Sequence, residues 1–151
     1  MNWEKFDKNV DIDELNKDIE ESAANGNGNY EDVPNGNYEV KVDKLELKES
    51  KKGDIMVSAW FKILNGRFKN SYIFYNQVIK QGFQIHLANE LLRSLDSGID
   101  VPSKFNGYAK YNDMVLDIAE KIETQKLEYE LKYGENKKGF KTFEIVNVFE
   151  N

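Results

Sequence analysis

The sequence of 151 residues contains no cysteine, one histidine and two prolines, and it has no long apolar run. The absence of cysteine excludes disulfides, thiolate metal sites and cysteine nucleophiles. No apolar stretch approaches the roughly 18 residues that a membrane-spanning helix requires. The N-terminus has mixed charge and lacks the apolar core of a signal peptide, which argues against secretion. We therefore expect a cytoplasmic protein with no membrane partner.

The residue types that usually carry catalysis are also scarce. The single histidine, His86, lies in an amphipathic stretch, where a lone histidine is more often a surface or packing residue than a base. Phosphate-binding glycine motifs are absent, and Asp11 and Asp13 lack the residues that would complete a calcium loop. Asp113 and Asp117 leave a catalytic carboxylate pair open, although a solvated helix face explains them better. The sequence predicts a protein that is not an enzyme and has no cofactor or metal site.

Negative charge is abundant, but it is concentrated in one segment. The chain has 27 acidic residues against 21 Lys and Arg, a net charge of −6. Residues 1–36 hold ten acidic residues and three lysines, a net −7, so residues 37–151 carry +1. Residues 37–80 hold nine basic and five acidic residues, a net +4. Because phosphates are contacted mainly by Lys and Arg, the acidic total does not exclude a nucleic-acid partner.

This charge distribution suggests an arm followed by a domain. In the arm, residues 1–33, apolar residues at spacings of three and four predict a short helix over 11–22. The Asn- and Gly-rich stretch that follows predicts a flexible linker. The domain spans residues 34–151 and begins near Pro34.

The first part of the domain shows the alternation typical of strands. A long first strand begins near residue 36, and a change of parity around Asp43-Lys44 predicts a bulge. The second strand spans about 55–63. Asn65-Gly66 then predicts a two-residue hairpin turn, and the third strand spans about 67–76.

Helical periodicity replaces alternation after the third strand. Phe83, Leu87, Leu91 and Leu95 predict one amphipathic helix, and residues 112–123 predict a second. Two more strands follow, from about 127 to 133 and from 140 to 149. Five strands with helices between the third and fourth are the element order of the oligonucleotide-binding (OB) barrel. We therefore predict a mainly β protein with an α insertion, an OB-fold-like, five-stranded Greek-key barrel.

Two loops carry similar lysine pairs. Lys51 and Lys52 lie between the first and second strands, and Lys137 and Lys138 lie between the fourth and fifth. In OB folds these two loops flank a binding face formed by the second and third strands. A solvated hairpin loop would explain either pair alone, and their presence in both loops favours binding.

The second and third strands are rich in aromatic residues. Alternation places Phe61 in the core and Trp60 and Lys62 on the outer face, where rings can stack on bases and lysines can follow phosphates. The sequence leaves the orientation of the third strand open, as it does the packing of Trp60 and Tyr75 beneath the arm or the helices. The predicted nucleic-acid-binding residues are Lys51, Lys52, Trp60, Lys62, Arg67, Lys69, Tyr75, Lys137 and Lys138.

Three short patterns in the domain resemble a known family. They are Pro34-x-Gly36-x-Tyr38-x-Val40, Ser50-Lys51-x-Gly53-x-x-Met56-Val57 and Asn65-Gly66-Arg67-Phe68, and they accompany Phe6-Asp7 and the acidic arm. This combination resembles small single-stranded-DNA-binding proteins from the replication and recombination modules of tailed bacteriophages, formerly a domain of unknown function. The resemblance implies a non-enzymatic protein in an infected or lysogenic bacterial host, acting beside a phage recombinase, exonuclease or helicase.

Two hypotheses of function follow. In the first, the lysine loops and outward aromatic rings bind single-stranded DNA, while the acidic arm masks the groove or recruits partners. In the second, the protein is an interaction module or a phage-encoded inhibitor whose acidic arm mimics nucleic acid. The last strand is apolar on both faces, which favours burial against the helical insertion or against a second subunit in a homodimer.

Overall fold

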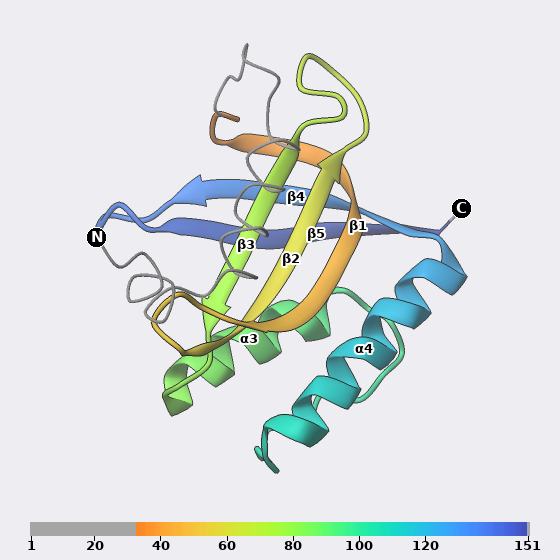
Figure 1. Cartoon of the computed structure of the whole chain (residues 1–151). Coiled ribbons are helices and arrows are strands. Elements are labelled where there is room, and N and C mark those ends of the chain that lie inside the picture. The colour runs from red at the N-terminus through yellow and green to blue at the C-terminus, as the bar shows by residue number, and fades with distance from the viewer. Residues whose placement is uncertain (1–32, 151) are drawn as a thin grey trace, which may run out of the picture.

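The computed structural model describes residues 33–150, so the predicted arm helix and linker lie outside the described residues. Within this range the chain forms five strands and two helices (Figure 1). In chain order they are β1 (Gly36–Glu49), β2 (Ile55–Ile63), β3 (Tyr72–Val78), α3 (Gly82–Ser94), α4 (Tyr108–Gln125), β4 (Leu127–Glu135) and β5 (Lys141–Glu150). Neither helix is long and apolar enough to cross a membrane.

The strands form one open antiparallel sheet in the order β3-β2-β1-β4-β5. The central strand, β1, pairs with β4 along its first residues and with β2 from Val40 to Glu49. The pairing register shifts between Val42 and Lys44, which confirms the predicted bulge. Because a bulge bends a strand, β1 curves across the sheet and passes from one partner to the other (Figure 1).

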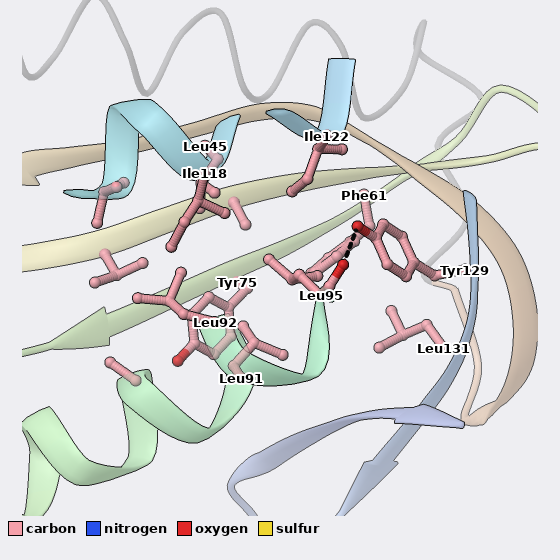
Figure 2. Close-up of a cluster of buried hydrophobic side chains, with 14 of the residues drawn as sticks. Leu45, Phe61, Tyr75, Leu91, Leu92, Leu95, Ile118, Ile122, Tyr129 and Leu131 are labelled. Carbon is pink, nitrogen blue, oxygen red and sulfur yellow. Dashed lines mark hydrogen bonds between the residues drawn. The ribbon is translucent and has the colours of Figure 1, made fainter. Parts of the chain in front are cut away.

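The core lies between the inner face of the sheet and the two helices. Alternate residues of β2, among them Val57 and Phe61, are fully buried there. Figure 2 shows Leu91 and Leu92 of α3 beside the ring of Tyr75, and Ile118 and Ile122 of α4 directed into the same cluster. The hydroxyl of Tyr129 donates a hydrogen bond to the carbonyl of Leu95 over 2.7 Å, so the one polar atom of this large core side chain is satisfied.

Both helices differ from the predicted spans. The second half of α3 is buried, but Phe83 and Leu87, predicted to belong to its apolar stripe, are exposed. The second helix begins earlier than predicted, at Tyr108. The Tyr108 hydroxyl donates to the carbonyl of Ile79 over 2.8 Å, so a contact outside the helical period anchors this first turn.

The third strand begins later than predicted. The chain between β2 and β3 forms a turn, and the amide of Asn70 donates to the carbonyl of Ile63 over 2.8 Å. Gly66 and Asn70 both have positive φ, at 78° and 72°. The two-residue turn at Asn65-Gly66 is therefore wrong, because a longer loop closes this hairpin at Ile63 and Ser71.

The two edges of the sheet, β3 and β5, are not hydrogen-bonded to each other. They approach through side chains, because the rings of Tyr75 and Phe143 meet edge to face with centroids 5.0 Å apart. The outward side of β5 stays open, with Val146 39% and Phe149 40% exposed. The helices therefore leave this side of the last strand uncovered, and its burial against a second subunit stays a prediction.

Candidate nucleic-acid interface

The candidate interface lies on the outer face, which is the side of β1, β2 and β3 opposite the core. Strand register aligns Trp60 of β2 with Lys44 of β1 and Phe74 of β3. The next outward position of β2, Lys62, aligns with Lys41 and Tyr72. Lysines therefore border three aromatic side chains, Trp60, Tyr72 and Phe74, which we call the aromatic cluster.

The rings of the aromatic cluster pack on one another and remain partly exposed. The Trp60 ring meets the edges of the other two, with centroids 5.4 Å from Phe74 and 5.8 Å from Tyr72. The rings of Tyr72 and Phe74 are nearly parallel, at 14°. The ammonium nitrogen of Lys44 lies 4.7 Å from the centroid of the Trp60 ring, a cation–π contact. The cluster thus presents ring surface and positive charge together.

The bulge in β1 anchors one member of the aromatic cluster. The Tyr72 hydroxyl donates a hydrogen bond of 2.8 Å to Oδ2 of Asp43, the residue at the register shift. The ammonium group of Lys41 lies 4.0 Å from the same carboxylate. Loss of solvent contact, together with the hydrogen bond and the negative charge of Asp43, raises the pKa of Tyr72 to about 12. The phenol therefore stays protonated at neutral pH and keeps this contact.

The other end of the outer face is closed to solvent. Ser58 is 1% exposed, and Met56 and Lys48, which are paired in the register, are 9% and 6% exposed. The accessible part of the outer face is therefore the end that carries the aromatic cluster, with Lys44 and Lys62 half-buried beside the rings.

The structure places Tyr75 in the core, so its predicted position on the outer face is wrong. Tyr75 is 6% exposed and pairs with Ala59, an inward position of β2, while Tyr72 and Phe74 point outward. Burial raises the pKa of the Tyr75 phenol. Sequence reasoning missed Tyr72 and Phe74, because alternation defines two faces of a strand and does not say which one is covered. Knowing that Phe74 pairs with the outward residue Trp60 across β2 and β3 would have placed Phe74 and Tyr72 on the outer face.

The basic residues predicted on the third strand lie in the loop before it. Arg67 and Lys69 are exposed between β2 and β3, and the guanidinium carbon of Arg67 lies 5.5 Å from the centroid of the Phe68 ring. They belong to the end of the sheet where β2 finishes and β3 begins. This is the end that carries Lys62 and Tyr72.

Both predicted lysine loops are exposed turns. Gly53 and Gly139 have φ values of 85° and 84°, a conformation that glycine adopts without strain, and each closes a tight turn behind its lysine pair. Lys51 and Lys52, and likewise Lys137 and Lys138, are exposed. Figure 1 shows both loops projecting to the left of the sheet.

The aromatic cluster and the β1–β2 loop lie at different ends of β2. Trp60 is five residues from Ile55, where the strand begins, and a strand rises about 3.3 Å per residue, so the separation is roughly 16 Å. A ligand that contacts both must therefore be extended.

The β4–β5 loop also carries an exposed ring that sequence reasoning missed. Phe140 is 67% exposed, and it was missed because it follows the loop at the expected start of a strand.

The residues that the sequence offered for catalysis, His86, Asp113 and Asp117, all lie on the two helices. Among residues 33–150, no group of three or more acidic or histidine side chains is placed to hold a metal ion. His86 is exposed on α3, with Nε2 3.0 Å from the carboxylate of Glu90. Asp113 and Asp117 line a pocket between the two helices. No residue of the aromatic cluster lines this pocket.

Comparison with protein families gives one match, which covers most of the chain. Residues 19–151 match the model of a family described as protein of unknown function (DUF669). The match covers every described element, including the strands that carry the aromatic cluster. No curated protein matches the chain.

Proposed function

For this chain, which belongs to the DUF669 family of proteins of unknown function, we propose a non-enzymatic role in binding single-stranded DNA. The observation that carries the proposal is the aromatic cluster on the outer face, with Lys44 4.7 Å from the Trp60 ring. Large rings on the solvent side of a sheet add nothing to the core on its other side. They are suited to stacking with bases, which are flat and apolar on both faces.

The sheet architecture supports an OB-like reading of the domain. The order β3-β2-β1-β4-β5, with a long bulged β1 shared between β2 and β4, is compatible with a partly open five-stranded barrel. The contact between Tyr75 and Phe143 brings the two free edges together without backbone hydrogen bonds. In this reading the face of β2 and β3 is the binding face, as OB folds generally use it.

In the proposed mechanism the rings bind bases and the lysines bind phosphates. Bases stack on the exposed surfaces of Trp60 and Phe74, and Lys44 and Lys62 neutralise the phosphates beside them. Further basic residues bind phosphates beyond the aromatic cluster. They are Arg67 and Lys69 beside the cluster, and Lys51, Lys52, Lys137 and Lys138 in the two loops. Because stacking is possible with every base, the mechanism predicts little sequence preference.

The setting of this function comes from the sequence resemblance. We place the protein in phage replication or recombination, in the cytoplasm of an infected or lysogenic bacterial host. A phage recombinase, exonuclease or helicase is its proposed partner, recruited through the acidic residues 1–33. Removing residues 1–33 should strengthen DNA binding if they mask the interface, and should leave it unchanged if they only recruit partners.

Tryptophan fluorescence tests the proposal directly. The chain has two tryptophans, Trp3 and Trp60, so the variant Trp3→Phe makes Trp60 the single reporter. We expect oligo(dT) to quench this fluorescence with saturation. The affinity should fall linearly with the logarithm of salt concentration, with a slope of about −0.7 for each phosphate neutralised.

Two controls make the experiment decisive. Phe83→Ala removes an exposed ring from α3, away from the outer face, and should leave DNA binding unchanged. The second measurement repeats the titration without residues 1–33, so that masking cannot hide the interface. If neither the full chain nor the truncated chain binds oligo(dT) at low salt, the proposal is wrong.

The −7 charge of residues 1–36 favours a second candidate, an interaction module or inhibitor whose acidic segment mimics nucleic acid. It makes the opposite prediction for the two regions. Binding to a basic protein partner would survive Trp60→Ala and loop-lysine substitutions, and would be lost when residues 1–33 are deleted. Co-purification from host cells with each variant separates the two functions.

A further inference from the structure

A second site lies between the helices, independent of the outer face. A pocket of about 440 Å³ is bounded by Ile85 and Asn89 of α3, the segment 99–107 and residues 110–117 of α4. We call it the helix pocket. Pockets of about 300–1,000 Å³ with apolar walls and a few polar groups are the usual form of small-ligand sites. Its apolar walls include Ile85, Ile99, Phe105 and Met114.

A buried amide in the helix pocket has a donor without a protein partner. Asn89 is 4% exposed, and its Oδ1 accepts a hydrogen bond of 2.7 Å from the hydroxyl of Tyr111, which is 7% exposed. Among the described residues, nothing accepts a hydrogen bond from Nδ2 of Asn89. Nearly all buried polar groups in proteins are hydrogen-bonded to protein or to ordered water, so this donor is available to an acceptor atom that enters the pocket. The contact with Tyr111 holds the amide in orientation, with Nδ2 left for a ligand.

The remaining lining residues indicate the chemistry of that ligand. The ring of Phe105 is 36% exposed and contacts Tyr111, with centroids 5.9 Å apart, so a flat apolar group can lie against it. Carboxylates of Asp113 and Asp117 can accept hydrogen bonds from hydroxyl groups, and Lys110 can contact an anion. A flat ring with a hydrogen-bond acceptor, attached to hydroxyls and a phosphate, satisfies all of these groups.

We propose that the helix pocket binds a nucleobase, with a base acceptor atom on Nδ2 of Asn89 and the base plane against Phe105. The base can come from a free nucleoside or nucleotide, or from a nucleic-acid strand. The pocket and the outer face share no described residue, so this site does not depend on the proposed DNA-binding function.

Side-chain amide resonances in NMR spectra test this proposal. We expect adenosine, cytidine or thymidine, titrated into the full chain, to give saturable shifts of the Asn89 NH₂ resonances. Phe105→Ala should reduce the response, and Met114→Trp should abolish it by filling the pocket. The matched controls are Phe83→Ala and Leu116→Trp, because both residues are exposed on the same helices and do not line the pocket.

Three further measurements distinguish the two sources of the base, and separate this proposal from the proposed DNA binding on the outer face. A stronger response to nucleoside monophosphates than to nucleosides indicates a free nucleotide, and a response to oligo(dT) alone indicates a base in a strand. Trp60→Ala should leave nucleoside shifts unchanged, so loss of DNA binding does not remove this site. The proposal is overturned if none of these probes shifts Asn89, or if Phe105→Ala and the pocket-filling variant respond like wild type.

Discussion

The two faces of β2 differ in what their side chains do. From the second inward position onward, the inward residues are aliphatic or small apart from one phenylalanine, and all of these are fully buried in the core. These inward residues are Val57, Ala59, Phe61 and Ile63. On the outer face, Trp60 and Lys62 remain half-exposed and belong to a surface of rings and lysines. One strand thus separates a face selected for packing from a face whose chemistry the core does not require.

Phe61 and Trp60 represent the two faces of β2 with one ring each. Both are large aromatic side chains on the same strand, one residue apart, and one is buried while the other is half-exposed. If the faces have separate roles, stability should depend mainly on Phe61, and ligand binding should depend mainly on Trp60.

The largest expected effect is on stability, from Phe61→Ala. Truncating a fully buried phenylalanine leaves a cavity and typically costs about 3–5 kcal/mol. Urea denaturation followed by circular dichroism measures the loss. Trp60→Ala should lower the free energy of unfolding by clearly less. Equal losses for the two variants would contradict the division of roles between the faces.

The next effect is on binding, from Trp60→Ala. Loss of a stacking ring costs about 1–3 kcal/mol per base, so the affinity for oligo(dT) should fall by about 5- to 150-fold. Fluorescence anisotropy of a labelled oligonucleotide measures this, since the variant lacks the Trp60 reporter. Phe74→Ala should act in the same direction. An unchanged affinity in both variants would mean that the aromatic cluster does not stack on bases.

A smaller effect is expected in the loops. Lys52→Gln removes one exposed charge from the β1–β2 loop, and Lys138→Gln does the same in the β4–β5 loop. Each should flatten the slope of log affinity against log salt by about 0.7 if the lysine contacts a phosphate. Lys121→Gln, an exposed lysine on α4, is the matched control and should leave the slope unchanged. Equal slopes for the loop variants and the control would place the loops outside the interface.

The smallest effect concerns the anchor of the aromatic cluster. The pKa of Tyr72 is raised from 10.0 to about 12, so between these values the folded state keeps a proton that the unfolded state loses. The stabilisation is therefore complete below pH 10 and is lost as the pH rises towards 12. Asp43→Asn removes the negative charge and should lower the pKa of Tyr72, as followed by NMR titration of the tyrosine ring carbons. An unchanged pKa would mean that Asp43 does not anchor the phenol.

Local patterns in the sequence predicted much of the fold. The change of parity near Asp43 predicted the bulge, and alternation predicted that Val57 and Phe61 are buried together. Both depend on neighbouring residues of one strand. All five strands were found, although the third begins at Tyr72, later than predicted. The second helix begins earlier than predicted, where the Tyr108 hydroxyl donates to the carbonyl of Ile79.

Three of the errors have a common physical cause, because they required knowledge of what covers a surface. Tyr75 and Phe74 are adjacent aromatic residues, and only the pairing of β3 with β2 shows which one faces the core. Phe83 continues the apolar period of α3, but it is exposed in the first turn, and the helix packs against the core only from Ile85 onward. Asn89 was not identified, since a lone Asn in an amphipathic helix resembles any polar position until its burial is known.

The bulge at Asp43 also changes which residues of β1 face the core, from even-numbered to odd-numbered positions. Before it, Tyr38, Val40 and Val42 are the residues that pack against the core, and after it Leu45 and Leu47 take that role. Deleting Asp43 alone would therefore remove the bulge and its bend, and would leave a regularly alternating strand in which Lys44 still faces outward and Leu45 inward. Among members of the family, a one-residue gap at this position should therefore leave the pattern of leucines and lysines after it unchanged, whereas a second inserted residue should invert that pattern.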